Sequence, residues 1–322
     1  MDTHDAESRL TLAHPLMLGV DGGGTKTQAW LARVDDQGQP QVLGRGIAGS
    51  SNKVAIGFES AMANLGDAIK QAFADAQLAM SPIASAAFAL AGSGTEEVRQ
   101  QILDFVKQNF LVESASVIHD GQAVLQAGTP DGWGIAMIAG TGTVAYGANS
   151  LGKTAVVGGW GYWFGDEGSA YWLGQSALRA ISHAADGRAD PTALTAVILN
   201  KLETREPREI LAALLRKGDV RREIANLAEL VCQVAEQQDD VANQIVNQAA
   251  QHWSRHIECL AQQLVPDEPF PLALAGGVLC GSSYARSRLI EQLEAKQLRT
   301  SSVEFVSEPV VGCVQLALKY SV

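Results

Sequence analysis

Short apolar runs alternate with glycine-rich and polar turns near the start of the chain. Runs of strand length at 15–20 and 28–34 flank the glycine turn 21–27, and a third extended run at 41–46 follows a polar turn. Because two apolar strands flank the glycine turn with no helix between them, the pattern predicts a β-meander rather than a βαβ unit.

The remaining pattern predicts helices and strands in alternation. Residues 55–80 carry apolar side chains at helical spacing, a strand is expected at 84–90, and Thr95 is expected to cap a helix that ends near Phe110. A strand at 114–118 then leads into His119 and Asp120. The second half is expected to contain strands at 134–139, 144–147, 154–157, 271–275 and 303–306, with helical segments at 167–264, 283–296 and 310–320.

A strand, a glycine turn and a second strand therefore occur twice, about a hundred residues apart. This repeat predicts an α/β protein with two duplicated lobes. The formal net charge of −11 argues against a broad nucleic-acid surface, which is normally basic, and against anionic membranes. It does not argue against ATP, because local amide groups and a metal ion set the field in a phosphate site.

Several features indicate a cytoplasmic location. No apolar run approaches the length of a membrane span, and residues 1–14 are polar, lack the regions of a signal peptide and are expected to form a flexible tail. The four cysteines are isolated, with no CxxC pair, which favours buried reduced thiols. His252 and His256 have zinc-like spacing but no third ligand in sight, which favours a solvated helix face.

Three glycine turns, at 21–27, 139–143 and 275–278, each follow an apolar strand. Backbone N–H groups in such turns can converge on phosphate oxygens, although any one turn is equally well explained as a hairpin or helix cap. The chain contains no GxxxxGK[ST] run, and residues 22–27 lead into a strand rather than a helix. A phosphate site in this chain would therefore be of the hairpin type.

Two aspartates follow strands and are candidates for chemistry. Asp120 can act as the general base for a hydroxyl or as the N-cap of the helix that follows, and the residues alone leave both open. Asp21 can form an Asx turn or lie near a metal ion. Lys26 can contact phosphate or remain solvated.

The three glycine turns resemble the phosphate-1, phosphate-2 and adenosine motifs of the actin/hexokinase/Hsp70 superfamily. The run VGGWGYWFGDEGSA at 157–170 is similar to the N-acetylglucosamine kinases of the BadF/BadG/BcrA/BcrD ATPase family. The resemblance implies an actin-like, ribonuclease H-like α/β fold with two lobes around a central nucleotide and sugar cleft. It places 15–118 with 306–322 in the N-terminal lobe and 119–305 in the C-terminal lobe.

The resemblance also implies a sugar kinase, a phosphotransferase that uses ATP and Mg²⁺ to convert an amino sugar, expected to be N-acetylglucosamine, to its 6-phosphate. Asp120 matches the catalytic base and a sugar contact, and Asp21 matches a residue near Mg²⁺, reached through water. Nucleotide-binding positions are Gly23, Gly24, Thr25, Lys26, Gly140, Thr141, Gly142, Gly276 and Gly277, and sugar-binding positions are Asn52, Thr143, Val144, Gly159, Trp160, Gly161 and Asp166.

The exact sugar and the rival functions depend on a few residues. Val157, Trp163 and Phe164 differ from the animal enzymes, and glucosamine is the alternative acceptor, although the glucosamine kinases of this family break the GGWG…GDEG pattern. An activator of a 2-hydroxyacyl-CoA dehydratase would need cluster-binding cysteines, and a sugar sensor would need a helix-turn-helix before residue 15. The expected partners are the amino sugar and ATP, with no nucleic acid and no membrane, and a homodimer stays open.

Overall fold

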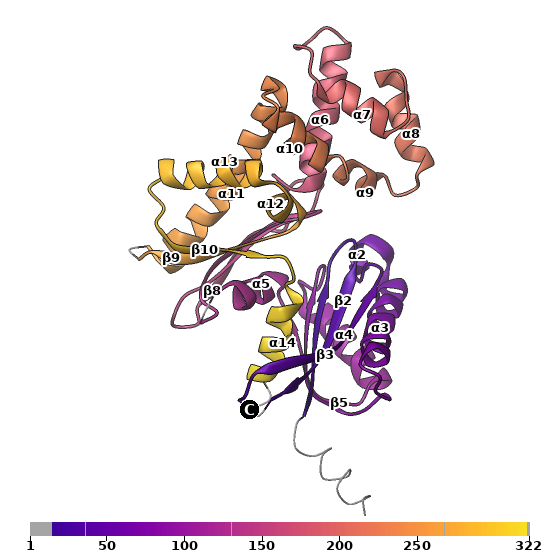
Figure 1. The fold of residues 1–322 in the computed structure, drawn as a ribbon, viewed down its shortest axis with the longest axis vertical. Coiled ribbons are helices and arrows are strands. Elements are labelled where there is room, and N and C mark those ends of the chain that lie inside the picture. The colour runs from indigo at the N-terminus through magenta and orange to yellow at the C-terminus, as the bar shows by residue number, and fades with distance from the viewer. Residues whose placement is uncertain (1–14, 36, 130, 267, 321–322) are drawn as a thin grey trace, which may run out of the picture. The chain divides into compact units, whose positions relative to one another are not determined.

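The computed structural model describes residues 15–35, 37–129, 131–266 and 268–320 (Figure 1). These residues form two compact units: unit 1 holds the described residues up to Gly132 and from Glu308 onward, and unit 2 holds Trp133–Ser307. The expected lobe boundary after residue 118 differs from this division, because helix α5 (Asp120–Gly128) packs on helix α14 (Val310–Lys319) within unit 1. The expected tail at 1–14 lies outside the described residues.

The sheet of unit 1 has the strand order β3-β2-β1-β4-β5. Strands β1, β2 and β3 form the expected antiparallel meander, while β4 and β5 run parallel to β1. Asp21 pairs with Ala89, which in turn pairs with Ile118, so the carboxyl ends of the three parallel strands meet at one edge. The strands span Leu16–Gly22 (β1), Thr27–Val34 (β2), Pro40–Ala48 (β3), Ile83–Leu90 (β4) and Val112–Ile118 (β5).

Helices cover both faces of this sheet, as alternate strand residues point to opposite sides. Leu18 and Phe88 join the core beneath α3 (Phe58–Asp75) and α4 (Glu96–Asn109), whereas Met17 and Ala87 join the core beneath α5 and α14. Figure 1 shows α14, in yellow, beside α5. The single helix expected at 55–80 is wrong: Gly57, with φ of 82°, separates the short α2 (Lys53–Ile56) from α3.

The sheet of unit 2 repeats the topology of the first, with the order β10-β9-β6-β7-β8. Strands β6, β7 and β8 form an antiparallel meander, and β9 and β10 run parallel to β6. The duplication predicted from the repeated pattern is therefore present in the strand order. The strands span Gly134–Ala139 (β6), Thr143–Ala148 (β7), Thr154–Gly158 (β8), Phe270–Ala275 (β9) and Thr300–Val306 (β10).

The helical part of unit 2 is built around α11, whose Trp253 is fully buried and donates its indole N–H to the carbonyl of Gly168 at 3.1 Å. His252 and His256 lie half-buried on α11, so the solvated face expected for them is wrong. The helices span Ala170–Ala185 (α6), Leu194–Lys201 (α7), Pro207–Glu209 (η1), Ile210–Arg216 (α8), Val220–Ala225 (α9), Ala228–Glu236 (α10), Asp240–Leu264 (α11), Gly277–Gly281 (α12) and Ser283–Ala295 (α13).

Two other expectations meet the structure here. Cys232 and Cys313 are buried and Cys280 is partly buried, whereas Cys259 is exposed, so the expectation of buried thiols is wrong for Cys259. Within the described ranges, no helix combines the length and the apolar character that crossing a bilayer requires.

Candidate active site

Asp21 lies near the end of β1, and the first glycine run continues from there into the turn that follows. The Gly23 N–H donates to the carbonyl of Lys26 at 3.0 Å and closes the turn, and the Ser50 hydroxyl donates to the carbonyl of Gly23 at 3.0 Å. Gly24, Thr25 and Lys26 are exposed. The turn is therefore fixed from the side of residue 50, while its tip is open to a ligand.

Asn52 lies on the same loop as Ser50 and caps α2. Its side-chain oxygen accepts the N–H of Val54 at 3.0 Å, which leaves its amide NH₂ group as the donor that it can offer. A Cβ on Gly22 would lie 1.9 Å from the Ser51 hydroxyl oxygen, so the loop rests directly on the end of β1. The structure thus brings together the predicted sugar residue Asn52 and the predicted phosphate turn.

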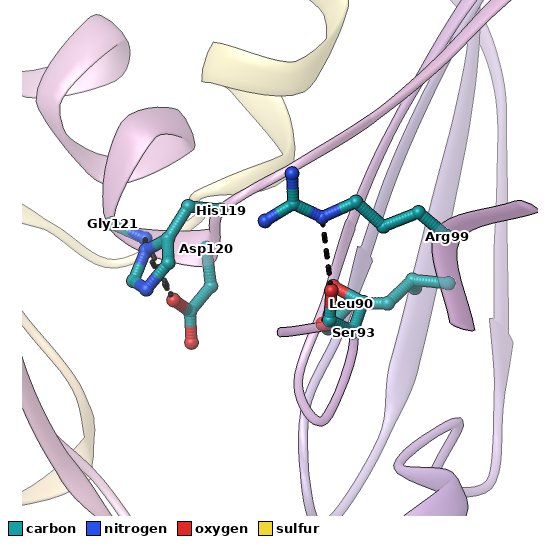
Figure 2. A network of polar contacts seen from close by, with 6 residues as sticks. All are labelled: Leu90, Ser93, Arg99, His119, Asp120 and Gly121. Carbon is teal, nitrogen blue, oxygen red and sulfur yellow. Dashed lines mark hydrogen bonds and ion pairs between the residues drawn. The ribbon is translucent and has the colours of Figure 1, made fainter. Parts of the chain in front are cut away.

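Asp120 is the first residue of α5, directly after β5 (Figure 2). His119 occupies the N-cap position of this helix, so the N-cap role considered for Asp120 is wrong. One carboxylate oxygen of Asp120 lies 2.8 Å from the Gly121 nitrogen and 3.0 Å from the His119 Nδ1. Its side chain is 30% exposed, so the carboxylate remains open to a ligand.

The two aspartates have opposite electrostatic surroundings. Burial disfavours the charged form of Asp120, but hydrogen bonds from His119 and the Gly121 N–H outweigh it and hold the pKa of this carboxyl below its ordinary value. Burial, followed by the negative charge of Asp120, raises the pKa of Asp21 to about 7, and Lys26 offsets only part of this. Asp120 is therefore ionised at neutral pH, and Asp21 lies where a cation would be favourable.

This donor set fits a magnesium ion that keeps most of its waters. In the described part of the chain, no group of three or more His, Cys, Asp or Glu side chains forms a metal site. Mg²⁺ commonly uses one or two protein carboxylates together with substrate phosphates and water. Asp21 would be one such carboxylate, and a bound cation would offset the desolvation of its charge.

Arg99 adds a positive group at the same edge of the unit 1 sheet. Its Nε donates to the carbonyl of Ser93 at 3.1 Å, and Ser93 follows β4, the strand paired with β5. Figure 2 shows its guanidinium pointing toward His119 and Asp120. The sequence pattern did not single out this arginine, because a lone charge on a helix has no motif.

In unit 2, the second glycine turn joins β6 to β7. The Gly140 N–H donates to the carbonyl of Gly142 at 3.0 Å, and the Gly140 carbonyl accepts the N–H of Ala170 at 2.8 Å. Gly276 has φ of 91°, and a Cβ there would lie 2.4 Å from the carbonyl of Ala139. The glycine turns 139–143 and 275–278 are therefore in contact, while a Cβ on Gly277 would meet nothing within 4 Å.

Asp166 belongs to the run 157–170 and connects it to the glycine turn between β6 and β7. Its carboxylate accepts the N–H of Thr143 at 3.1 Å, and Gly159 donates its N–H to the carbonyl of Thr143 at 2.9 Å. The Thr143 hydroxyl is buried and, among the described residues, has no hydrogen-bond partner. Thr143, Gly159 and Asp166 thus form one cluster, and Val144 lies beside it, 3.2 Å from a Cβ placed on Gly159.

The aromatic side chains of the same run are exposed rather than buried. Trp160, Trp163 and Phe164 expose 73%, 80% and 76% of their surface, and Gly161 bends the chain between them with φ of 84°. Trp160 and Trp163 are therefore not core residues. Tyr162 stacks on Trp163, with ring centroids 4.9 Å apart.

Three comparisons with known proteins agree on the class of protein. A model of the BadF/BadG/BcrA/BcrD ATPase family matches residues 18–317, so the chain belongs to this family. Among solved structures, a putative N-acetylglucosamine kinase from Chromobacterium violaceum superposes with a TM-score of 0.75 at 28% identity, covering 94% of this chain and 99% of that one. The fold is therefore the actin-like ATPase fold.

Two curated relatives cover almost the whole chain. An N-acetylmuramic acid/N-acetylglucosamine kinase from Clostridium acetobutylicum is 26% identical over 94% of this chain and 97% of its own length. An N-acetyl-D-glucosamine kinase from Dictyostelium discoideum is 28% identical over 95% of this chain and 99% of its own. The particular relatives of this ATPase are thus sugar kinases.

Proposed function

We propose that this protein transfers the γ-phosphate of ATP to a hydroxyl group of an amino sugar, with N-acetylglucosamine as the acceptor and its 6-phosphate as the product. The observation that carries the proposal is the ionised, partly exposed carboxylate of Asp120 at the edge where the parallel strands of unit 1 end. The names of the relatives from Clostridium and Dictyostelium support the same reaction.

In the proposed reaction, Asp120 accepts the proton of the sugar hydroxyl as its oxygen attacks the γ-phosphorus. The bond between that phosphorus and the oxygen of the ADP leaving group breaks in the same step. Phosphoryl transfer passes through a loose transition state, so orientation of the hydroxyl matters more than a strong base. The hydrogen bonds from Gly121 and His119 hold the carboxylate in one orientation, which suits this role.

Each of the three glycine turns is proposed to offer nucleotide-binding groups within its own unit. Unit 1 offers the exposed Gly24, Thr25 and Lys26 together with the partly exposed Gly23. In unit 2, the turn Gly140–Thr141–Gly142 would contact phosphate, and Gly276 and Gly277 would lie against the nucleoside. Bound Mg²⁺ would neutralise charge on the phosphates, and Asp21 would hold it through water.

Sugar-binding groups are proposed in each unit separately. Asn52 would donate from its amide, while Asp166 and the buried Thr143 hydroxyl would accept and donate hydrogen bonds. Gly159, Trp160, Gly161 and Val144 would form the surface against which the sugar lies. Sugars are commonly fixed by a few such convergent polar groups.

A second acceptor is favoured by Arg99. A sugar that carries a carboxylate would find a guanidinium directed toward Asp120, and the Clostridium relative is named for N-acetylmuramic acid as well as N-acetylglucosamine. Glucosamine, the unacetylated alternative, has no matching observation among the residues described above. The test below therefore compares N-acetylmuramic acid, which carries a carboxylate, directly with the neutral N-acetylglucosamine.

The test is an ADP-release assay with N-acetylglucosamine, N-acetylmuramic acid, glucosamine, N-acetylmannosamine and glucose. We expect the highest kcat/KM with N-acetylglucosamine, and the position of the phosphate is checked by NMR of the product. Omission of Mg²⁺ should abolish ADP release. Highest activity with glucosamine or glucose would overturn the N-acetylglucosamine assignment, and sugar-independent ATP hydrolysis alone would overturn the kinase assignment.

A further inference from the structure

The carboxylate of Asp166 is buried, and its backbone adopts an uncommon conformation. Its backbone has φ of 56°, a left-handed conformation that is uncommon for residues other than glycine, and only 5% of the residue is exposed. Burial raises the pKa of its carboxyl, although the Thr143 N–H and the charge of Arg221 oppose this. A protonated Asp166 would have no negative charge and one hydrogen-bond acceptor fewer. If Asp166 is to hold a sugar hydroxyl, a neighbouring group must therefore favour its ionised form.

Arg221 on α9 is the cation that faces this carboxylate. Its Nη2 lies 3.6 Å from the second carboxylate oxygen of Asp166, while the first accepts the N–H of Thr143. The other charged group acting on Asp166 is Glu167, which has the same sign and raises the pKa of Asp166 further. Arg221 therefore opposes both the burial of Asp166 and the charge of Glu167.

The guanidinium of Arg221 packs on an aromatic ring, and the helix that carries it is closely packed. The guanidinium lies over the ring of Tyr162, 4.5 Å from the centroid, and Tyr162 belongs to the same run as Asp166. The helix that carries Arg221 approaches α6 closely, since a Cβ on Gly174 would lie 2.0 Å from the carbonyl of Ile224. The Nε of Arg221 is buried and, in the ranges described, has no hydrogen-bond partner. The contacts of Arg221 are thus arranged around the ring and the carboxylate.

We propose that Arg221 is a positioning residue for sugar binding, which keeps the Asp166 carboxylate ionised and oriented toward the sugar without contacting the sugar itself. The inference rests on the proposed function, because it takes Asp166 as a sugar ligand. It extends the site to α9, which lies outside the GGWG…GDEG run and the glycine turns. The closeness of Gly174 and Ile224 fixes the position of α9 and hence of Arg221.

The test is the pH dependence of kcat/KM for N-acetylglucosamine in the wild type, Arg221→Gln and Arg221→Lys. Loss of the charge in Arg221→Gln raises the pKa of Asp166 further, so the acidic limb moves to higher pH. We expect a loss of kcat/KM that grows as the pH falls, on the order of tenfold on the acidic side of the profile, and an effect mainly on KM for the sugar. Arg221→Lys keeps the charge and should keep the limb close to that of the wild type.

Arg222→Gln is the matched control, because Arg222 is exposed on the same helix and its backbone N–H, which bonds to the Asp219 carboxylate, is unchanged. It should leave both the pH profile and the melting temperature unchanged. A uniform loss at all pH values in Arg221→Gln, without a shift of the limb, would overturn the positioning role.

Two further outcomes keep the inference separate from the proposed function. A wild type that transfers no phosphate to N-acetylglucosamine overturns the proposed function and this inference with it. An active wild type whose Arg221→Gln variant keeps the normal acidic limb overturns this inference alone. If Arg221→Gln does not fold, Arg221→Lys decides, because lysine keeps the positive charge. A large shift of the acidic limb to higher pH in Arg221→Lys would contradict the charge argument.

Discussion

At the scale of the residue, Asp21 and Asp120 show how neighbouring carboxyl groups acquire different properties. Both lie where parallel strands of the unit 1 sheet end at one edge, Asp21 within β1 and Asp120 just past β5. Asp120 receives hydrogen bonds from the Gly121 N–H and His119, whereas Asp21 is buried near a like charge. Because such donors stabilise the charged form and burial destabilises it, the first is suited to accept a proton and the second to attract a cation.

Replacement of Asp120 by asparagine tests its role as the base. Asparagine retains an oxygen that can accept the Gly121 N–H, and His119 remains the N-cap, so the variant should fold and bind ATP. Loss of the proton acceptor should lower kcat by about 10²–10⁴-fold. Turnover and a thermal melt are measured together on the same preparation.

Asp35→Asn is a suitable control for that variant. Asp35 is also in unit 1 and accepts backbone N–H groups, from Gln37 and Gln39, but lies in an exposed turn after β2. It should leave turnover unchanged. A near-normal kcat in Asp120→Asn would remove Asp120 as the base.

At the scale of the element, the glycines of the third turn have different tasks. Gly276 adopts φ of 91° and lies against the carbonyl of Ala139, so its missing side chain lets the turn contact the end of β6. Gly277, the first residue of α12, has open space where a side chain would begin. One glycine is therefore needed for the fold, and the other leaves room that a nucleotide could occupy.

The matched pair Gly276→Val and Gly277→Val separates these tasks. Gly276→Val should destabilise the protein by about 1–3 kcal/mol or more, because the side chain meets backbone and the conformation is strained. Gly277→Val should melt close to the wild type but raise KM for ATP, on the order of tenfold, if this position lines the nucleotide site. An unchanged KM for ATP in a folded Gly277→Val would argue against that placement.

At the scale of the whole molecule, the chain builds the same five-stranded topology twice and then returns to the first unit. Helix α14 packs against β1 and α5, and its Cys313 and Leu316 share a core with Met17 of β1. A Cβ on Gly312 would lie 1.9 Å from the carbonyl of Ala123, so the approach of α14 to α5 requires glycine there. Unit 1 therefore depends on residues far apart in the sequence.

Gly312→Ala tests the close packing of α14 against α5. Alanine normally stabilises a helix by up to about 1 kcal/mol relative to glycine. At Gly312 the clash with α5 should reverse the sign, and the melting temperature should fall. Gly281→Ala is the control, since Gly281 is also helical and a Cβ there meets nothing within 4 Å. A rise in melting temperature at both positions would contradict the close packing of α14.

The sequence by itself determined the meanders, the strand-end glycine turns and the family, because these depend on local periodicity and on short motifs. It also placed Asp120 after a strand, but not its electrostatic state, since the hydrogen bonds to His119 and Gly121 depend on side-chain orientation. Only the tertiary structure brought Gly276 against Ala139 and Arg221 against Asp166. Those contacts join segments distant in the chain, and no local pattern encodes a contact that packing creates.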